Sequence, residues 1–228
     1  MNAAAAAAML LVLLHRTIAP SAFIPASAPA PLVVPLTVVV EEGSAWTAPG
    51  RLEAVLGKAS AILGRCGVSL GTAEVGVARW SPEALKLLNA ADPYKAPPEA
   101  AVLDASVPAG TPKALLFGAR SIPSTAKAYN VKFVETFSPR FPETVRMLNT
   151  FWITEDQESR RKPDLGPAYS VFAHELVHLL GNVGHVPDHP NLMTDDDGPG
   201  AKSGDLSPEQ CAAVRKLYGL PVSSPRAP

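Results

Sequence analysis

The alternation of hydrophobic and polar positions predicts a chain of strands and helices that begins near Leu32. Leu36–Glu42 is apolar and β-branched, which is typical of a buried strand. After Pro49, apolar residues recur at helical spacing and predict one long helix that ends at Gly67. Its buried face would consist of Leu52, Val55, Leu56, Ala59, Ile62 and Leu63. A second strand follows from Val68 towards Val77, and we expect it to pair in parallel with the first, with the helix as crossover.

Three further strands are predicted in the middle of the chain. They are Ala114–Ala119, Val131–Phe137 and Asn149–Glu155. In Val131–Phe137 apolar and polar residues alternate, so we expect a strand with one face in water. Before these strands we expect a short helix, Pro82–Asn89, and a proline-rich connection without regular structure, Asp92–Pro112.

Two helices are predicted in the last third of the chain. The first runs from about Pro167 to Leu180 and has an apolar face. The second starts at Ser207-Pro208 and ends at Gly219. Ser207 has the features of an N-cap, proline suits the first helical position, and Gln210 completes a capping box.

The first of these helices contains His174-Glu175-x-x-His178. Residues four apart lie on the same face of a helix, so His174 and His178 can reach one metal ion. Glu175 is turned by about 100° around the helix, which places it beside the metal and suits it to act as a general base towards a metal-activated water. Gly181 follows, and we expect it to end the helix in the left-handed conformation.

A third metal ligand is expected in the loop after this helix. His185 is our first choice, and Asp188 and His189 are the alternatives. Two histidines from a helix and one from a loop would leave a coordination position open, as catalytic zinc requires. The sequence therefore predicts Zn²⁺ bound by His174, His178 and His185.

These residues, with Met193 shortly after them, resemble the metzincin metallopeptidases, whose pattern is His-Glu-x-x-His-x-x-Gly-x-x-His followed by a Met-turn. The chain departs from the pattern at Gly184, where the family has its third histidine; here His185 comes one residue later. The resemblance implies that Met193 forms a hydrophobic floor beneath the metal and does not bind it.

The resemblance also implies a fold. We expect an α/β (α+β) protein with a twisted, mixed, five-stranded sheet, a long crossover helix, an active-site helix and a small C-terminal subdomain that ends in a helix. The predicted order of elements agrees with this fold from Leu32 to Met193. One edge strand would run antiparallel and line the cleft, where a substrate pairs with it through backbone hydrogen bonds. Val131–Phe137 is our candidate for that strand.

Length and composition fit one domain of moderate size. The chain has 228 residues, of which 47% are hydrophobic, and a formal net charge of −1. We expect a single metallopeptidase domain at residues 32–220, with an upper subdomain at 32–181 and a lower one at 182–220. Residues 221–228 would be a disordered tail. There is no basic stripe, so we expect no nucleic-acid partner.

The N-terminal residues 1–30 are expected to be a signal peptide. Ala3–Leu14 is apolar but short for a membrane span, and small residues follow, with candidate cleavage after Ala22 or Ala28. An uncleaved membrane anchor or a disordered alanine-rich extension are the alternatives. We favour a secreted or extracytoplasmic protein that is free of the membrane once the signal is removed.

Cys66 and Cys211 are the two cysteines of the chain. In an exported protein an even number of cysteines favours a disulfide, and this one would tie the last helix to the end of the first long helix. Two buried free thiols are the alternative if the protein is not exported.

Together these features favour a monomeric, zinc-dependent endopeptidase that acts on proteins or peptides, with Glu175 as its catalytic base. The alternative is a secreted zinc protein with a binding or structural role and no catalysis. Glu175 argues against that alternative, because a structural zinc site needs ligands but no base.

Overall fold

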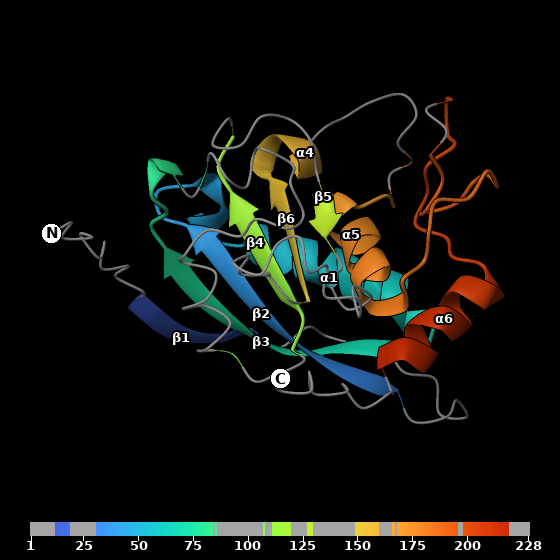
Figure 1. Ribbon diagram of the computed structural model, residues 1–228, viewed down its shortest axis with the longest axis horizontal. Coiled ribbons are helices and arrows are strands. Elements are labelled where there is room, and N and C mark those ends of the chain that lie inside the picture. The colour runs from blue at the N-terminus through green and yellow to red at the C-terminus, as the bar shows by residue number, and fades with distance from the viewer. Residues whose placement is uncertain are drawn as a thin grey trace, which may run out of the picture.

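A six-stranded mixed sheet is the central element of this computed structural model, which describes residues 12–18, 31–83, 85, 107, 111–119, 127–129, 149–159, 166, 168–195 and 198–218 (Figure 1). The strands are β1 (Val12–Ile18), β2 (Leu32–Glu41), β3 (Val68–Ala78), β4 (Lys113–Phe117), β5 (Lys127–Tyr129) and β6 (Thr150–Thr154). Their order across the sheet is β1-β3-β2-β4-β6-β5. The four inner strands are parallel, and the edge strands β1 and β5 are antiparallel to their neighbours.

The described helices are η1 (Ala45–Thr47), α1 (Arg51–Gly64), α4 (Glu155–Ser159), α5 (Val171–Gly181) and α6 (Pro208–Tyr218). The predicted crossover is confirmed, because α1 connects the parallel strands β2 and β3. It begins at Arg51 and not at Pro49: Gly50, with φ of 77°, is the N-cap, and the proline lies in the preceding turn. The mixed α/β class and the predicted order of the main elements are therefore observed.

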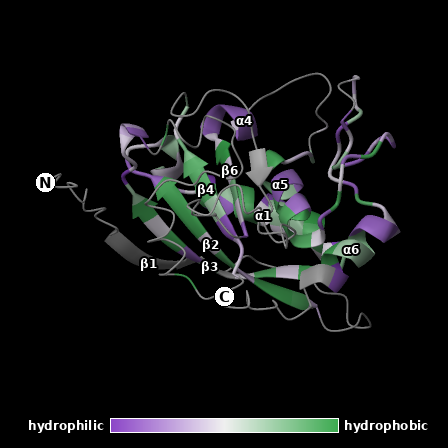
Figure 2. Ribbon diagram, viewed as in Figure 1, coloured by the Kyte–Doolittle hydropathy of each residue, from purple (hydrophilic) through white to green (hydrophobic). Residues whose placement is uncertain are grey.

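The hydrophobic core lies between the sheet and the helices α1 and α5, which Figure 1 shows on the same side of the sheet. Alternate residues of the inner strands point into it, because successive side chains of a strand point to opposite faces. They are Val34, Leu36, Val38 and Val40 of β2, Ala114 and Leu116 of β4, and Phe151 and Ile153 of β6. Figure 2 shows the same contrast in hydropathy: the inner strands are mostly hydrophobic, whereas α4 is hydrophilic.

Strand β1 differs from our expectation for residues 1–30. Val12–Ile18 was predicted to belong to a signal peptide or a disordered extension, yet it forms an antiparallel edge strand against β3, with Ile18 opposite Ala73. Without it, β3 would be the edge and would present a row of unpaired backbone groups. The sheet thus contains four of the five strands expected after residue 32, together with β1 and β5; the rest of residues 1–30 lies outside the described residues.

The antiparallel strand at the opposite edge is β5, Lys127–Tyr129. An antiparallel edge strand was predicted, but at Val131–Phe137, a range that lies outside the described residues. The proline-rich connection at Asp92–Pro112 and the tail at 221–228 also lie largely or wholly outside them. Of the short helix predicted at Pro82–Asn89, the structure describes the start, where the amide of Leu85 donates to the carbonyl of Ser81 at 3.0 Å.

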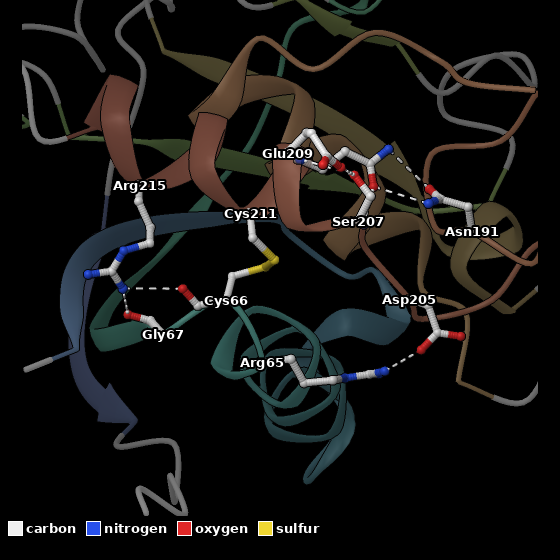
Figure 3. Close-up of a disulfide and its surroundings, with 10 residues drawn as sticks. Arg65, Cys66, Gly67, Asn191, Asp205, Ser207, Glu209, Cys211 and Arg215 are labelled. Carbon is white, nitrogen blue, oxygen red and sulfur yellow. Dashed lines mark hydrogen bonds and ion pairs between the residues drawn. A yellow bond between two sulfur atoms is a disulfide. The ribbon is translucent and has the colours of Figure 1, made fainter. Parts of the chain in front are cut away.

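Helix α6 is attached to the end of α1 by the disulfide between Cys66 and Cys211, whose Cα atoms are 4.9 Å apart (Figure 3). The predicted pairing is therefore present. Arg215 adds a second link, since its guanidinium donates to the carbonyl oxygens of Cys66 at 3.2 Å and Gly67 at 2.8 Å. An ion pair on the solvent side joins Arg65 to Asp205, which lies in the segment before α6.

The start of α6 has the predicted capping box. The hydroxyl of Ser207 accepts from the amide of Gln210 at 3.2 Å, and the side-chain oxygen of Gln210 accepts from the amide of Ser207 at 2.7 Å. Among the helices of the described residues, none is long and apolar enough to cross a membrane.

Candidate metal centre

Helix α5 carries His174, Glu175 and His178, and its start is fixed by side chains. It begins at Val171 and not near Pro167, because Ser170 is the N-cap: its hydroxyl accepts from the amide of Ala173 at 3.2 Å. The carboxylate of Glu158, on α4, accepts from the amide of Phe172 at 2.8 Å and from the hydroxyl of Ser170 at 3.0 Å. Two of the amides at the start of the helix are thereby paired, which sets where its first turn lies.

The end of α5 directs the chain back towards the helix. Asn182, with φ of 48°, is the left-handed C-cap, and its amide donates to the carbonyl of His178 at 3.0 Å. The prediction that Gly181 takes this conformation is wrong, because Gly181 is the last helical residue. Asparagine tolerates the left-handed region better than most residues, so it can serve as the cap in place of glycine.

The three predicted histidine ligands come together. The Nε2 atoms of His174, His178 and His185 each lie 3.1 Å from the other two. Zinc binds imidazole nitrogen at ~2.0–2.1 Å, so tetrahedral coordination separates its ligand nitrogens by roughly 3.3 Å. The three atoms therefore fit one small tetrahedral metal ion.

Hydrogen bonds on the far side of two rings decide which nitrogen carries the proton. The Nδ1 atom of His174 lies 2.7 Å from the carbonyl oxygen of Leu192, and that of His178 contacts the carbonyl oxygen of Val183. A carbonyl oxygen can only accept, so both Nδ1 atoms are donors, and in the neutral rings both Nε2 atoms present lone pairs. Lone pairs that converge in this way match the requirements of a metal ion.

Burial keeps these rings neutral. It lowers the pKa of His174 to about 3, with the neighbouring His178 as the next cause, while the hydrogen bond to Leu192 opposes the shift. Burial also lowers the pKa of His178. Metal ligation requires the neutral imidazole, so the lowered pKa keeps His174 available as a ligand well below the ordinary pKa of histidine, and the shift at His178 acts in the same direction.

The three histidines differ in their exposure to solvent. His174 is buried, His178 is half-buried and His185 is exposed. A metal ion held by the three would therefore have both a buried and an exposed ligand. Glu175, directly after the first ligand, is only 6% exposed.

The loop after α5 also holds the other predicted site residues. Met193 is fully buried in the core, and its carbonyl accepts from the amide of Val186 at 3.0 Å. The residue before it, Leu192, supplies the acceptor for His174, so the chain next to Met193 contacts this candidate ligand through its backbone. Asp188 and His189, the alternative third ligands, are exposed and lie outside the histidine cluster.

Sequence reasoning did not identify the groups that hold the ligands in place. The carbonyl acceptors at Val183 and Leu192 have no signature, because every residue has a carbonyl. Glu158 could have been noticed only as an acid ahead of a helix, which is a common pattern. Tyr169, whose ring centre lies 6.1 Å from that of His174, was also not predicted.

Comparison with protein-family models found no match to this chain, and comparison with curated proteins found none either.

Proposed function

We propose that this protein is a zinc-dependent endopeptidase of metzincin type that hydrolyses peptide bonds of protein or peptide substrates. The observation that carries the proposal is the triangle of His174, His178 and His185 Nε2 atoms, 3.1 Å on each side, with Glu175 on the same helix. A structural zinc site has four protein ligands, whereas the described residues bring together three, as in catalytic sites.

Zinc in this position would polarise the scissile carbonyl and lower the pKa of a water molecule to about 7. His174, His178 and His185 would hold the ion through neutral rings, and the carbonyls of Leu192 and Val183 would keep two of those rings in the correct tautomer. Glu175 would accept the proton of the attacking water and deliver it to the leaving amine. No nucleophilic side chain is needed.

We also propose that the protein acts as a monomer in a secreted or extracytoplasmic compartment. The disulfide between Cys66 and Cys211 supports this location, because disulfides persist mainly where the surroundings are oxidising. We further propose that a substrate pairs through backbone hydrogen bonds with β5, the antiparallel edge strand that packs beside α5.

The test combines metal analysis with a peptide-library assay. We expect about one zinc per chain, cleavage of internal peptide bonds, loss of cleavage with a chelator, and recovery on addition of zinc. The Glu175→Gln variant should keep its zinc and lose turnover by ~10²–10⁴-fold, because an amide cannot accept the proton. Zinc binding without cleavage by the unaltered protein would instead identify a zinc protein with a binding role, and turnover retained in Glu175→Gln would exclude Glu175 as the base.

A further inference from the structure

The orientation of His174 depends on the position of one peptide carbonyl. The Leu192 carbonyl accepts from Nδ1 of His174 at 2.7 Å, and the amide of Leu192 donates to the carbonyl of Asp205 at 2.7 Å. The imidazole can turn only as far as this acceptor allows. Whatever fixes the turn around Leu192 therefore also fixes the direction in which Nε2 of His174 points.

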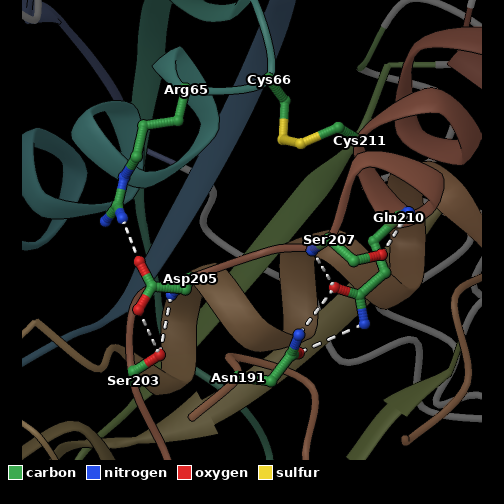
Figure 4. A network of polar contacts seen from close by, with 8 residues as sticks. All are labelled: Arg65, Cys66, Asn191, Ser203, Asp205, Ser207, Gln210 and Cys211. Atoms are coloured by element: carbon green, nitrogen blue, oxygen red, sulfur yellow. Dashed lines mark hydrogen bonds and ion pairs between the residues drawn. A yellow bond between two sulfur atoms is a disulfide. The ribbon is translucent and has the colours of Figure 1, made fainter. Parts of the chain in front are cut away.

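Asn191 fixes that turn from inside. Its side-chain oxygen accepts from the amide of Met193 at 2.8 Å, which closes the turn around Leu192. The Asn191 side chain is itself held by Gln210 of α6: Asn191 Nδ2 donates to Gln210 Oε1 at 3.1 Å, and Gln210 Nε2 donates to Asn191 Oδ1 at 3.2 Å (Figure 4). Both residues are buried, so neither amide can replace a lost partner with bulk water at low cost.

Backbone donors determine how the two amides are oriented. The amide N–H of Met193 can only donate, so the atom of Asn191 that it contacts is the oxygen. In the same way, the N–H of Ser207 identifies the Gln210 atom at 2.7 Å as the oxygen. The two remaining NH₂ groups then face the opposite oxygens, and all four hydrogen bonds are satisfied by one arrangement.

We propose that Gln210 is a positioning residue of the metal centre, which acts on His174 through Asn191 and the carbonyl of Leu192. This inference rests on the metal site of the proposed function but not on peptide hydrolysis. Gln210 is suited to the role because it lies on a fixed part of α6: the capping box holds its backbone, and the next residue, Cys211, is bonded to Cys66.

The experiment compares Gln210→Met with Ser207→Ala. Gln210→Met keeps the length of the side chain and removes its hydrogen bonds to Asn191. Ser207→Ala removes the hydroxyl of the same capping box and leaves the amide pair intact. We expect Gln210→Met to raise the zinc dissociation constant about tenfold, the lower end of the effect of losing an outer-shell partner, and to alter the visible absorption spectrum of the cobalt-substituted protein. Ser207→Ala should lower the unfolding midpoint and change neither readout.

Equal zinc affinity and an unchanged cobalt spectrum in Gln210→Met would overturn the proposal, as would the same loss of affinity in Ser207→Ala. If Gln210→Met does not fold, Gln210→Glu takes its place; it keeps the acceptor for Asn191 and Ser207 and removes the donor, so weaker zinc binding than in Ser207→Ala is again expected. Failure of the unaltered protein to bind zinc would overturn both this inference and the proposed function. Zinc binding without cleavage would overturn only the catalytic function.

Discussion

Gly181 of α5 lies directly against Val214 of α6. A β-carbon at Gly181 would lie 2.9 Å from Val214 Cγ2 and 3.1 Å from the Val214 backbone nitrogen, so the glycine allows the two helices to approach this closely. Since the nitrogen belongs to the backbone, the conflict could be relieved only by moving a helix. The helix that carries His174 and His178 is thus placed against α6 by the absence of a side chain.

We expect Gly181→Ala to destabilise the protein by ~1–3 kcal/mol, the range for overpacking a well-packed interior. Gly57→Ala is the matched control, because Gly57 lies within α1 and a β-carbon there would meet nothing within 4 Å. That substitution should stabilise the protein by roughly 0.5–1 kcal/mol through helix propensity. Urea denaturation of both variants provides the measurement, and an unaffected midpoint for Gly181→Ala would contradict the close packing.

The role of Gly181 illustrates what the sequence could not reveal. A glycine after a helical pattern is typical of a left-handed cap, and on that basis Gly181 was predicted to be one. The structure assigns the cap to Asn182 and a packing role to Gly181. The need for close packing comes from Val214 of α6, 33 residues further along the chain (214 − 181), and local pattern cannot report it.

The three candidate metal ligands were predictable to different degrees. His174 and His178 follow from helical spacing alone, since residues four apart share a face. His185 was a choice among three loop residues, because the path of a loop depends on contacts that the sequence does not display. Here the path is set by the Asn182 cap and by the bond from His178 to the carbonyl of Val183.

His185→Ala should therefore weaken zinc binding by more than the ~10–100-fold that loss of an outer-shell partner costs, because it removes a direct ligand. His189→Ala is the control, since His189 is exposed in the same loop and lies outside the histidine cluster. Competition with a chromogenic chelator measures both dissociation constants. A larger loss of affinity in His189→Ala than in His185→Ala would show that the loop binds the metal through another residue.

Glu158, which caps α5, should make stability depend on pH. Burial raises its pKa above the ordinary 4.5, although the hydrogen bonds from Phe172 and Ser170 oppose the shift. The folded protein therefore holds this proton more tightly than the unfolded chain. The resulting stabilisation is complete below about pH 4.5 and is lost as the pH rises through the raised pKa of the folded state.

Glu158→Gln removes this titration, so the stability of the variant relative to the unaltered protein should improve as the pH rises through that window, by at most about 1.4 kcal/mol per pH unit. Glu209→Gln should show the opposite trend, because the hydroxyl of Ser207 lowers the pKa of Glu209 and its stabilisation is lost as the pH falls. Urea denaturation of chelator-treated protein at a series of pH values gives the free energy of unfolding of each variant and distinguishes the two pH trends. A pH-independent difference for Glu158→Gln would contradict the raised pKa.

The disulfide between Cys66 and Cys211 closes a loop with a sequence separation of 145, the longest-range covalent constraint among the described residues. On the chain-entropy model, closing a loop of that length stabilises a fold by about 4–5 kcal/mol, and removing a native disulfide costs about 2–5 kcal/mol in practice. We expect the Cys66→Ala, Cys211→Ala double variant to lose about 2–5 kcal/mol of its free energy of unfolding.

Arg65→Ala is the control for this last comparison, because Arg65 precedes Cys66 and its ion pair with Asp205 links the same two parts of the chain. The two side chains are 50% and 57% exposed, so loss of the ion pair should cost only ~0–1 kcal/mol. Guanidinium denaturation compares the two variants. Mass spectrometry without reduction tests the bond itself: the protein is unfolded only in the presence of an alkylating agent, and quantitative labelling of both cysteines would show that the bond is absent. The covalent link, and not the ion pair beside it, is expected to hold α6 against the end of α1.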